Sequence, residues 1–268
     1  MRIISLCPSN TEMVAYLGAE RELVGIDDFS DWPESVQNLP RLGPDLSIDM
    51  DAVESLQPDL IIASLSVPGM EKNIEELIKR DLPFITLNPQ SLDDIANDML
   101  QLGEKLNRKE TAQKQAERFQ TFIEHYRMIG ANVAKNRLYW EWWPKPIFTP
   151  GATNWLSYIS RLAGGKNIFE DQEQASIQTT WEDVLARDPD HICLAWVGVE
   201  TKRVQPKVVT KRENAEKAKA VTNNRIHILE EPLYCRPSPR LLLGLKKLAA
   251  LLHPETFPPN DEKDPLRL

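Results

Sequence analysis

Short apolar runs alternate along the chain with longer stretches in which apolar residues recur every three or four positions. In the first part of the chain, the short runs predict strands at residues 2–6, 23–26, 60–63 and 84–87. The helical spacing lies between them, at residues 9–18, 48–56 and 71–80. Because such alternation is typical of a parallel sheet covered by helices, this part is predicted to be an α/β unit.

The middle of the chain has a different pattern. From residue 91 to about 128 the helical spacing continues, and no apolar run that could form a strand interrupts it. One apolar stripe is formed by Ala112, Ala116, Phe119, Ile123 and Tyr126, while Lys and Glu residues fill the opposite face. The stripe predicts a long amphipathic helix, either an ordinary surface helix or a rigid connector between two α/β halves.

After residue 136 the alternation of strands and helices resumes. Strands are predicted at residues 138–142, 192–195 and 226–229, and helices at residues 155–163, 181–187 and from 238 to 252. The predicted fold is therefore α/β, and if the long helix is a connector, it consists of two Rossmann-like lobes bridged by one long helix. The expected division is an N-terminal lobe over 1–104, a connecting helix over 105–130, a C-terminal lobe over 131–257 and a polar tail over 258–268.

Two helix starts have typical capping residues. Ser9 and Glu12 show the spacing of a capping box, in which the serine caps the helix and the glutamate reaches back. Ser238 stands before Pro239, and proline is favoured in a first helical turn. These patterns predict that Ser9 caps the first helix and Ser238 the last.

Two distant segments are alike. One begins at Asp51 and the other at Glu182, and each has an acidic residue, a short helix, a Pro-Asp turn and a buried strand in that order. The coincidence of all four features predicts two similar lobes.

Charge and composition exclude several classes of function. The 268 residues have a formal net charge of −8, which argues against unspecific binding to nucleic acid. No run of 18 apolar residues is present, so no membrane span is expected. Met1 leads directly into the first apolar run without the features of an export signal, so we expect either that the chain, as written, is cytoplasmic or that its export signal is not in this sequence.

Signatures of catalysis are missing from the sequence. It contains no GxGxxG, GxxxxGK[ST], HExxH or GxSxG motif, and its four histidines are scattered. We therefore expect neither an enzyme nor a metal site, and no catalytic cofactor. The three separated cysteines form no disulfide framework; they are expected to be free thiols, with a ligand contact by Cys7 or Cys235 as the alternative.

The seven tryptophans are the most informative residues. In an open α/β sheet, ligands bind beyond the carboxyl ends of the strands, and Trp32, Trp142 and Trp196 each follow a predicted strand. Packing within the core is the alternative, and it is the favoured one for Trp155 and Trp181 at helix starts. Exposed rings at strand ends suit a flat, largely apolar ligand with polar edges.

The loop before the last helix is a second candidate. It contains Tyr234 and Arg236, and the guanidinium of Arg236 could bond an amide or phosphate of a ligand. Arg240 lies further along and is expected to be a surface charge.

Six segments occur in the order found in one protein family. The chain resembles the periplasmic binding protein family for vitamin B12 and iron-siderophores, most of all its cobalamin-binding branch, at residues 4–12, 30–33, 57–63, 148–151, 164–169 and 236–240. The resemblance implies a class III periplasmic-binding-protein-like fold, a monomer with a ligand between the lobes, an extracytoplasmic location and delivery of the ligand to an ABC transporter permease.

The resemblance also implies functional residues. Asp51 and Glu182 match the acidic residues that dock onto the permease; the alternative is that they only favour the starts of their helices. Ser64 stands where cobalamin binders often have a tryptophan, which indicates that the aromatic lining is redistributed to the cluster at Trp140–Trp143. The candidate ligand-binding residues are Cys7, Pro8, Ser9, Trp32, Ser64, Trp142, Trp196, Tyr234 and Arg236.

Three functions remain open from the sequence. The first is a solute-binding protein that captures a cobalamin-like corrinoid for an ABC importer. The second is a haem or ferric-siderophore binding protein. The third is a cytosolic corrinoid carrier or sensor that is not coupled to a permease.

Overall fold

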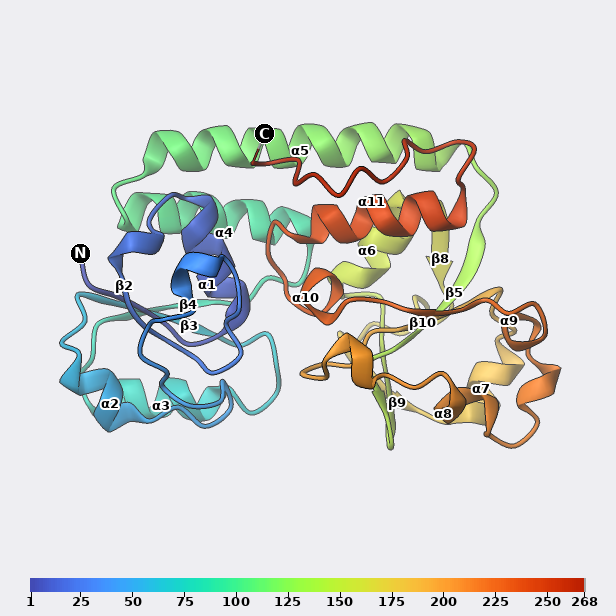
Figure 1. Ribbon diagram of the computed structural model, residues 1–268, viewed down its shortest axis with the longest axis horizontal. Coiled ribbons are helices and arrows are strands. Elements are labelled where there is room, and N and C mark those ends of the chain that lie inside the picture. Colours follow the sequence, from blue (N-terminus) through green and yellow to red (C-terminus); the bar gives the residue numbers. More distant parts are fainter. Residues whose placement is uncertain (268) are drawn as a thin grey trace. The chain divides into compact units, whose positions relative to one another are not determined.

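Figure 1 shows the computed structural model, which describes residues 1–267. The chain divides into a first unit, residues 1–120 with 237–239 and 267, and a second unit, residues 121–236 with 240–266. Each unit contains a four-stranded parallel sheet, as the alternating pattern predicts.

The sheet of the first unit has the order β2-β1-β3-β4. Its strands are β1 (Ile3–Ser5), β2 (Leu23–Ile26), β3 (Leu60–Ser64) and β4 (Phe84–Leu87). The two central strands, β1 and β3, are buried along their whole length, as expected for a sheet covered on both faces. All four lie where the apolar runs predict them.

Helices cover both faces of this sheet (Figure 1). The apolar side chains of α2 and α3 pack against the sheet around Ile4 and Ile61, where Val53 and Leu77 are fully buried. The helices of this unit are α1 (Pro8–Tyr16), α2 (Met50–Ser55), α3 (Glu71–Lys79) and α4 (Leu92–Lys105), with single 3₁₀ turns at Glu20–Glu22 and Glu34–Val36.

The middle of the chain forms two helices instead of one continuous stretch. The left-handed backbone of Asn107 (φ 55°) ends α4, and α5 (Lys109–Ala131) follows. Gly103 permits a close approach, because a Cβ atom at this position would lie 2.2 Å from the Cβ atom of Ala112. The predicted stripe of α5 is buried. This long helix begins in the first unit and ends in the second.

Both predicted helix caps are wrong. Cys7 is the N-cap of α1 and no side chain caps this helix, because Pro8 and Ser9 already lie within its first turn. The Glu12 carboxylate is fully buried and accepts a hydrogen bond from the Ser238 hydroxyl. Ser238 is therefore not the N-cap of α11 (Leu241–Leu252), which begins after Arg240. A capping box does occur at Ser91 and Asp94, at the start of α4.

The sheet of the second unit has the order β11-β10-β5-β8. Its strands are β5 (Asn136–Glu141), β8 (Gly165–Asn167), β10 (His191–Leu194) and β11 (Ile226–Ile228). A second, antiparallel sheet of β6 (Trp143–Pro144), β7 (Ile147–Pro150) and β9 (Ser176–Thr179) was not predicted. Strand β5 ends at Glu141, one residue earlier than predicted, because the chain turns here into the hairpin β6–β7.

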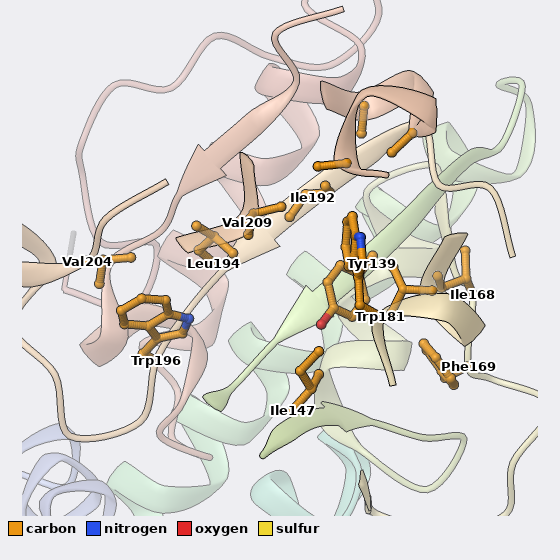
Figure 2. Close-up of a cluster of buried hydrophobic side chains, with 14 residues drawn as sticks. Tyr139, Ile147, Ile168, Phe169, Trp181, Ile192, Leu194, Trp196, Val204 and Val209 are labelled. Carbon is orange, nitrogen blue, oxygen red and sulfur yellow. The ribbon is translucent and has the colours of Figure 1, made fainter. Parts of the chain in front are cut away.

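The core of the second unit is shown in Figure 2, where Tyr139 lies beside Trp181. The short helices that follow β10 cover it with Val204 and Val209. The remaining elements are α6 (Trp155–Leu162), α7 (Trp181–Ala186), α8 (Lys207–Thr210), α9 (Lys219–Thr222) and α10 (Glu231–Tyr234), with 3₁₀ turns at Thr201–Arg203 and Ala215–Lys217. None of the helices within residues 1–267 is both long and apolar enough to cross a membrane.

The two similar segments adopt the same local structure. Asp51 and Glu182 are each the second residue of a six-residue helix, α2 and α7. Each helix is followed by a non-glycine residue in the left-handed region, Gln57 (φ 47°) and Asp188 (φ 43°), before a central strand begins. The structure thus confirms the internal similarity.

A histidine pair occupies one edge of the second sheet. His191 begins β10, and its Nδ1 atom lies 2.9 Å from Nε2 of His227 on β11, with the rings stacked. Burial, followed by the charge of His227, lowers the pKa of His191 to about 4, and burial also lowers the pKa of His227. The folded protein therefore favours the neutral form of both rings.

We expect the second unit to lose stability between pH 6.5 and 4. A histidine with a lowered folded-state pKa stabilises the fold fully above its unfolded pKa, and this stabilisation is lost as the pH falls toward the folded value. For His191 the loss between pH 7.5 and 5 is on the order of 2 kcal/mol. Urea unfolding at pH 7.5 and at pH 5 measures this loss. His191→Gln should reduce the difference in the free energy of unfolding between the two pH values, and the exposed His125→Gln should leave it unchanged. The same difference in both variants would contradict the expectation.

Candidate functional site

The turn from β1 into α1 lies at the carboxyl end of a central strand of the first unit. The thiol of Cys7 lies 3.3 Å from the Ser9 hydroxyl, and the Asn10 amide donates to the carbonyls of Ile62 and Ala63 at the end of β3. Burial raises the pKa of the Cys7 thiol to about 12, so the group is neutral at physiological pH. Cys7, Pro8 and Ser9 are all buried.

Ser64 belongs to the same cluster. It ends β3 beside Cys7, and its hydroxyl donates to Ser66 at 2.9 Å. Trp32 follows β2 on a loop that packs along α1. Its ring packs on Tyr16, the last residue of α1, with 5.2 Å between the ring centroids, and under the guanidinium of Arg267 at 4.1 Å. Ser30 of the same loop lies 2.7 Å from the Thr11 hydroxyl in the first half of this helix.

Three large apolar side chains of the first unit are exposed in loops near the strand ends and are not among the predicted site residues. Phe29 follows β2 and is 45% exposed, Leu65 follows β3 and is 37% exposed, and Leu46 is 45% exposed in a nearby loop. Hydrogen bonds between Asp28 and Gly43 hold the loops together. The sequence signal was available, because Phe29 and Leu65 stand two to three residues after predicted strands.

Trp142 and Trp196 lie at the carboxyl ends of neighbouring strands in the second unit. Val197 N donates to the Trp142 carbonyl at 3.1 Å, so the two strand ends stay paired. The Trp142 ring stacks on Trp155 with 5.7 Å between centroids. Its Nε1 atom is buried and has no hydrogen-bond partner in the described part of the chain. Both residues therefore lie at one edge of the sheet, as their positions in the sequence predict. The Trp196 ring is only 7% exposed and also packs in the core of the second unit, which is the alternative that the sequence left open for it.

The Tyr234 loop is anchored within the second unit. The buried Tyr234 hydroxyl donates to the Gly244 carbonyl at 2.8 Å, and Cys235 Sγ lies 3.2 Å from the Ala195 carbonyl. Arg236 is mostly buried and forms an ion pair with Glu231 at 3.0 Å. These contacts hold the loop against the end of β10, and the guanidinium of Arg236 already has a carboxylate partner.

The two candidate docking residues lie on helix starts. Asp51 is 85% exposed, and one of its oxygens lies 2.6 Å from Arg80, which also pairs with Glu54. Glu182 is exposed in the first turn of α7, which Thr180 caps. Both acids are thus accessible at equivalent positions of the two units.

The histidines lie elsewhere. His191 begins β10, His227 pairs with it, and His253 bonds the Gly164 carbonyl next to the start of β8, all toward the amino end of the second sheet. His125 is on the surface of α5. Within residues 1–267, no group of three or more His, Cys, Asp or Glu side chains is arranged to hold a metal ion.

Comparison with known proteins identifies relatives that are binding proteins. The family model for periplasmic binding proteins matches residues 3–233. The vitamin B12-binding protein of Yersinia pestis (strain Pestoides F) is 28% identical over 251 residues, which is 92% of this chain and 84% of the relative. An uncharacterized ABC transporter substrate-binding lipoprotein, YvrC of Bacillus subtilis, is 27% identical over 262 residues, 96% of this chain and 81% of the relative.

Solved structures similar to this chain are also periplasmic binding proteins. The periplasmic vitamin B12 binding protein BtuF of Vibrio cholerae has a TM-score of 0.78 and 27% identity, covering 94% of this chain and 96% of that one. A periplasmic heme binding protein from Pseudomonas aeruginosa has a TM-score of 0.83 at 21% identity, covering 96% and 94%. The second likeness shows the fold alone, which is that of class III periplasmic binding proteins.

Proposed function

Because this chain belongs to the periplasmic binding protein family, we propose that it captures a corrinoid of the cobalamin type and delivers it to an ABC importer. The family and its solved members are binding proteins, so a small-molecule ligand and a permease partner follow from membership. The identity of the ligand is the part that we propose.

One observation favours a flat ligand most directly. Trp142 and Trp196 lie at the carboxyl ends of neighbouring strands, which is where open α/β sheets bind ligands. Indole rings offer a large contact area at low cost in conformational entropy. Such rings suit the apolar faces of a corrin ring.

The placement of the histidines favours a corrinoid over haem. Haem iron needs an axial side chain, usually His, Tyr, Met or Cys, whereas the corrin cobalt can bring its own ligands. Three of the four histidines lie toward the amino end of the second sheet, away from Trp142 and Trp196. The nearby Tyr234 and Cys235 groups are buried and bonded to backbone carbonyls.

Titration of the purified protein with cyanocobalamin, dicyanocobinamide and haemin tests the proposal. We expect saturable binding of a corrinoid, seen as heat by isothermal titration calorimetry and as quenching of tryptophan fluorescence. Haemin should bind more weakly than the corrinoids. Absence of corrinoid binding would refute the proposal, and tighter binding of haemin or a ferric siderophore would assign the second ligand class.

Delivery to a permease is the other half of the proposal. Asp51 and Glu182 are proposed to dock there, because they are exposed at equivalent helix starts. Cell fractionation distinguishes this from a cytosolic carrier. Recovery of the protein with the membrane or outside the cytoplasm is expected, and recovery from the cytosol would exclude docking by these two residues.

A further inference from the structure

A fully buried carboxylate stands next to the two candidate rings. Glu141 is the last residue of β5, immediately before Trp142, and its exposed fraction is 0%. Its carboxylate accepts hydrogen bonds from the Tyr139 hydroxyl at 2.7 Å and from Trp196 Nε1 at 3.3 Å. Burying a charge of this kind is costly, and hydrophobic residues of similar volume often stabilise a fold at least as well. Its position therefore calls for an explanation other than stability.

Arg212, which is 71 positions further along the chain, supplies the countercharge. Its Nη1 and Nη2 atoms donate to the two oxygens of Glu141 at 2.6 and 3.1 Å, and Nη2 lies 3.4 Å from the Pro144 carbonyl. The side chain is 12% exposed, and its guanidinium lies over the Trp181 ring at 5.1 Å. A bidentate pair of this geometry fixes the orientation of both partners. The plane of the Glu141 carboxylate is thereby set.

The fixed carboxylate in turn sets the ring of Trp196. An indole has a single N–H donor, and that of Trp196 points to Oε1 of Glu141, the oxygen that Arg212 Nη2 also holds. Rotating the ring about its χ2 angle would break this bond and leave a buried donor without a partner. The hydrogen bond therefore holds the Trp196 ring in one orientation.

We propose that Glu141, held by Arg212, is the positioning residue that orients the Trp196 indole for contact with the ligand. The inference rests on the proposed function and deepens it. Glu141 itself touches no ligand. A purely structural role for the same network would lower stability without changing the ligand affinity of the folded protein, and this difference makes the inference testable.

A double-mutant cycle on cyanocobalamin affinity provides the test. Glu141→Gln keeps the shape of the side chain but removes its charge and one of its two acceptor oxygens, so Arg212 can no longer fix the plane of the group that Trp196 Nε1 bonds. We expect the dissociation constant to rise about 10-fold in the wild-type background, because contacting groups couple. In the Trp196→Phe background, where the N–H donor is already gone, Glu141→Gln should change the dissociation constant by less than about 2-fold.

A second readout follows the ring itself. In protein labelled with 5-fluorotryptophan, the Trp196 ¹⁹F resonance, assigned by its loss in Trp196→Phe, should shift or broaden in Glu141→Gln. The matched control is Ser160→Ala. The Ser160 hydroxyl accepts a hydrogen bond of 2.9 Å from Nε1 of Trp140, a buried tryptophan on the same strand as Glu141. This control should leave both the affinity and the Trp196 resonance unchanged.

The outcomes separate the inference from the function on which it rests. If the wild-type protein binds no corrinoid, the proposed function fails and the inference falls with it. If it binds and Glu141→Gln weakens binding equally in both backgrounds, or leaves the Trp196 resonance in place, the inference alone is wrong.

Discussion

Replacement of Arg212 by methionine is expected to destabilise the second unit by about 3–5 kcal/mol, because it leaves a buried carboxylate without its countercharge. The Glu141 oxygens would keep only the bonds from Tyr139 and Trp196. Methionine preserves much of the length and apolar contact of the Arg212 stem, so the loss reports the missing charge and its hydrogen bonds. Urea unfolding followed by circular dichroism measures the change.

A compensating variant separates this explanation from a loss of packing. Glu141→Gln combined with Arg212→Met removes both charges, so the double variant should recover part of the free energy lost in Arg212→Met. An exposed cation of the same unit, Lys202, is the control, and Lys202→Met should change stability by less than about 0.5 kcal/mol. A double variant as unstable as the sum of the single variants would show that the buried charge is not the cause.

Replacement of Trp142 by alanine is expected to weaken cyanocobalamin binding by about 100-fold, since truncated aromatic anchors commonly cost 2–4 kcal/mol of binding free energy. The prediction rests on the proposed function. Trp142 stacks on Trp155 and has a buried Nε1 donor with no partner in residues 1–267. Isothermal titration calorimetry measures the affinity, and urea unfolding checks that the variant remains folded.

The neighbouring tryptophan is the matched control for this prediction. Trp143 is exposed, and its Nε1 donates to the Lys145 carbonyl within the hairpin. Trp143→Ala should bind cyanocobalamin within about 2-fold of the wild type, as truncation away from the centre of a contact surface costs little. A folded Trp142→Ala protein with unchanged affinity would remove Trp142 from the candidate site.

Most of the elements were predictable because they depend on local periodicity. Strand β4 lies where its apolar run predicts it, and the stripe of α5 is buried as its spacing requires. The similarity of the segments at Asp51 and Glu182 was also visible, since each element there is short and local. The antiparallel sheet was missed because β6 has only two residues, too few to show any period.

The candidate site was only partly predictable. The positions of Trp142 and Trp196 after strands were sufficient to place them at one sheet edge. The neighbours of Trp32 could not be foreseen, because they lie on the last turn of α1 and at Arg267 near the end of the chain. The place of Arg236 in the loop before the last helix indicated a ligand contact, but its ion pair with Glu231 became visible only in the structure.

The sequence by itself determined the two α/β units and the long helix, because hydrophobic period and turn residues act over a few positions. Only the tertiary structure decided the partners of the polar side chains. Glu12 resembles a capping residue but bonds Ser238, which is 226 positions away, and Glu141 meets Arg212 across 71 positions. A buried carboxylate takes whichever donors the folded chain brings to it, and no local pattern encodes those donors. The two rings at the strand ends were therefore predictable, but the carboxylate that orients one of them was not.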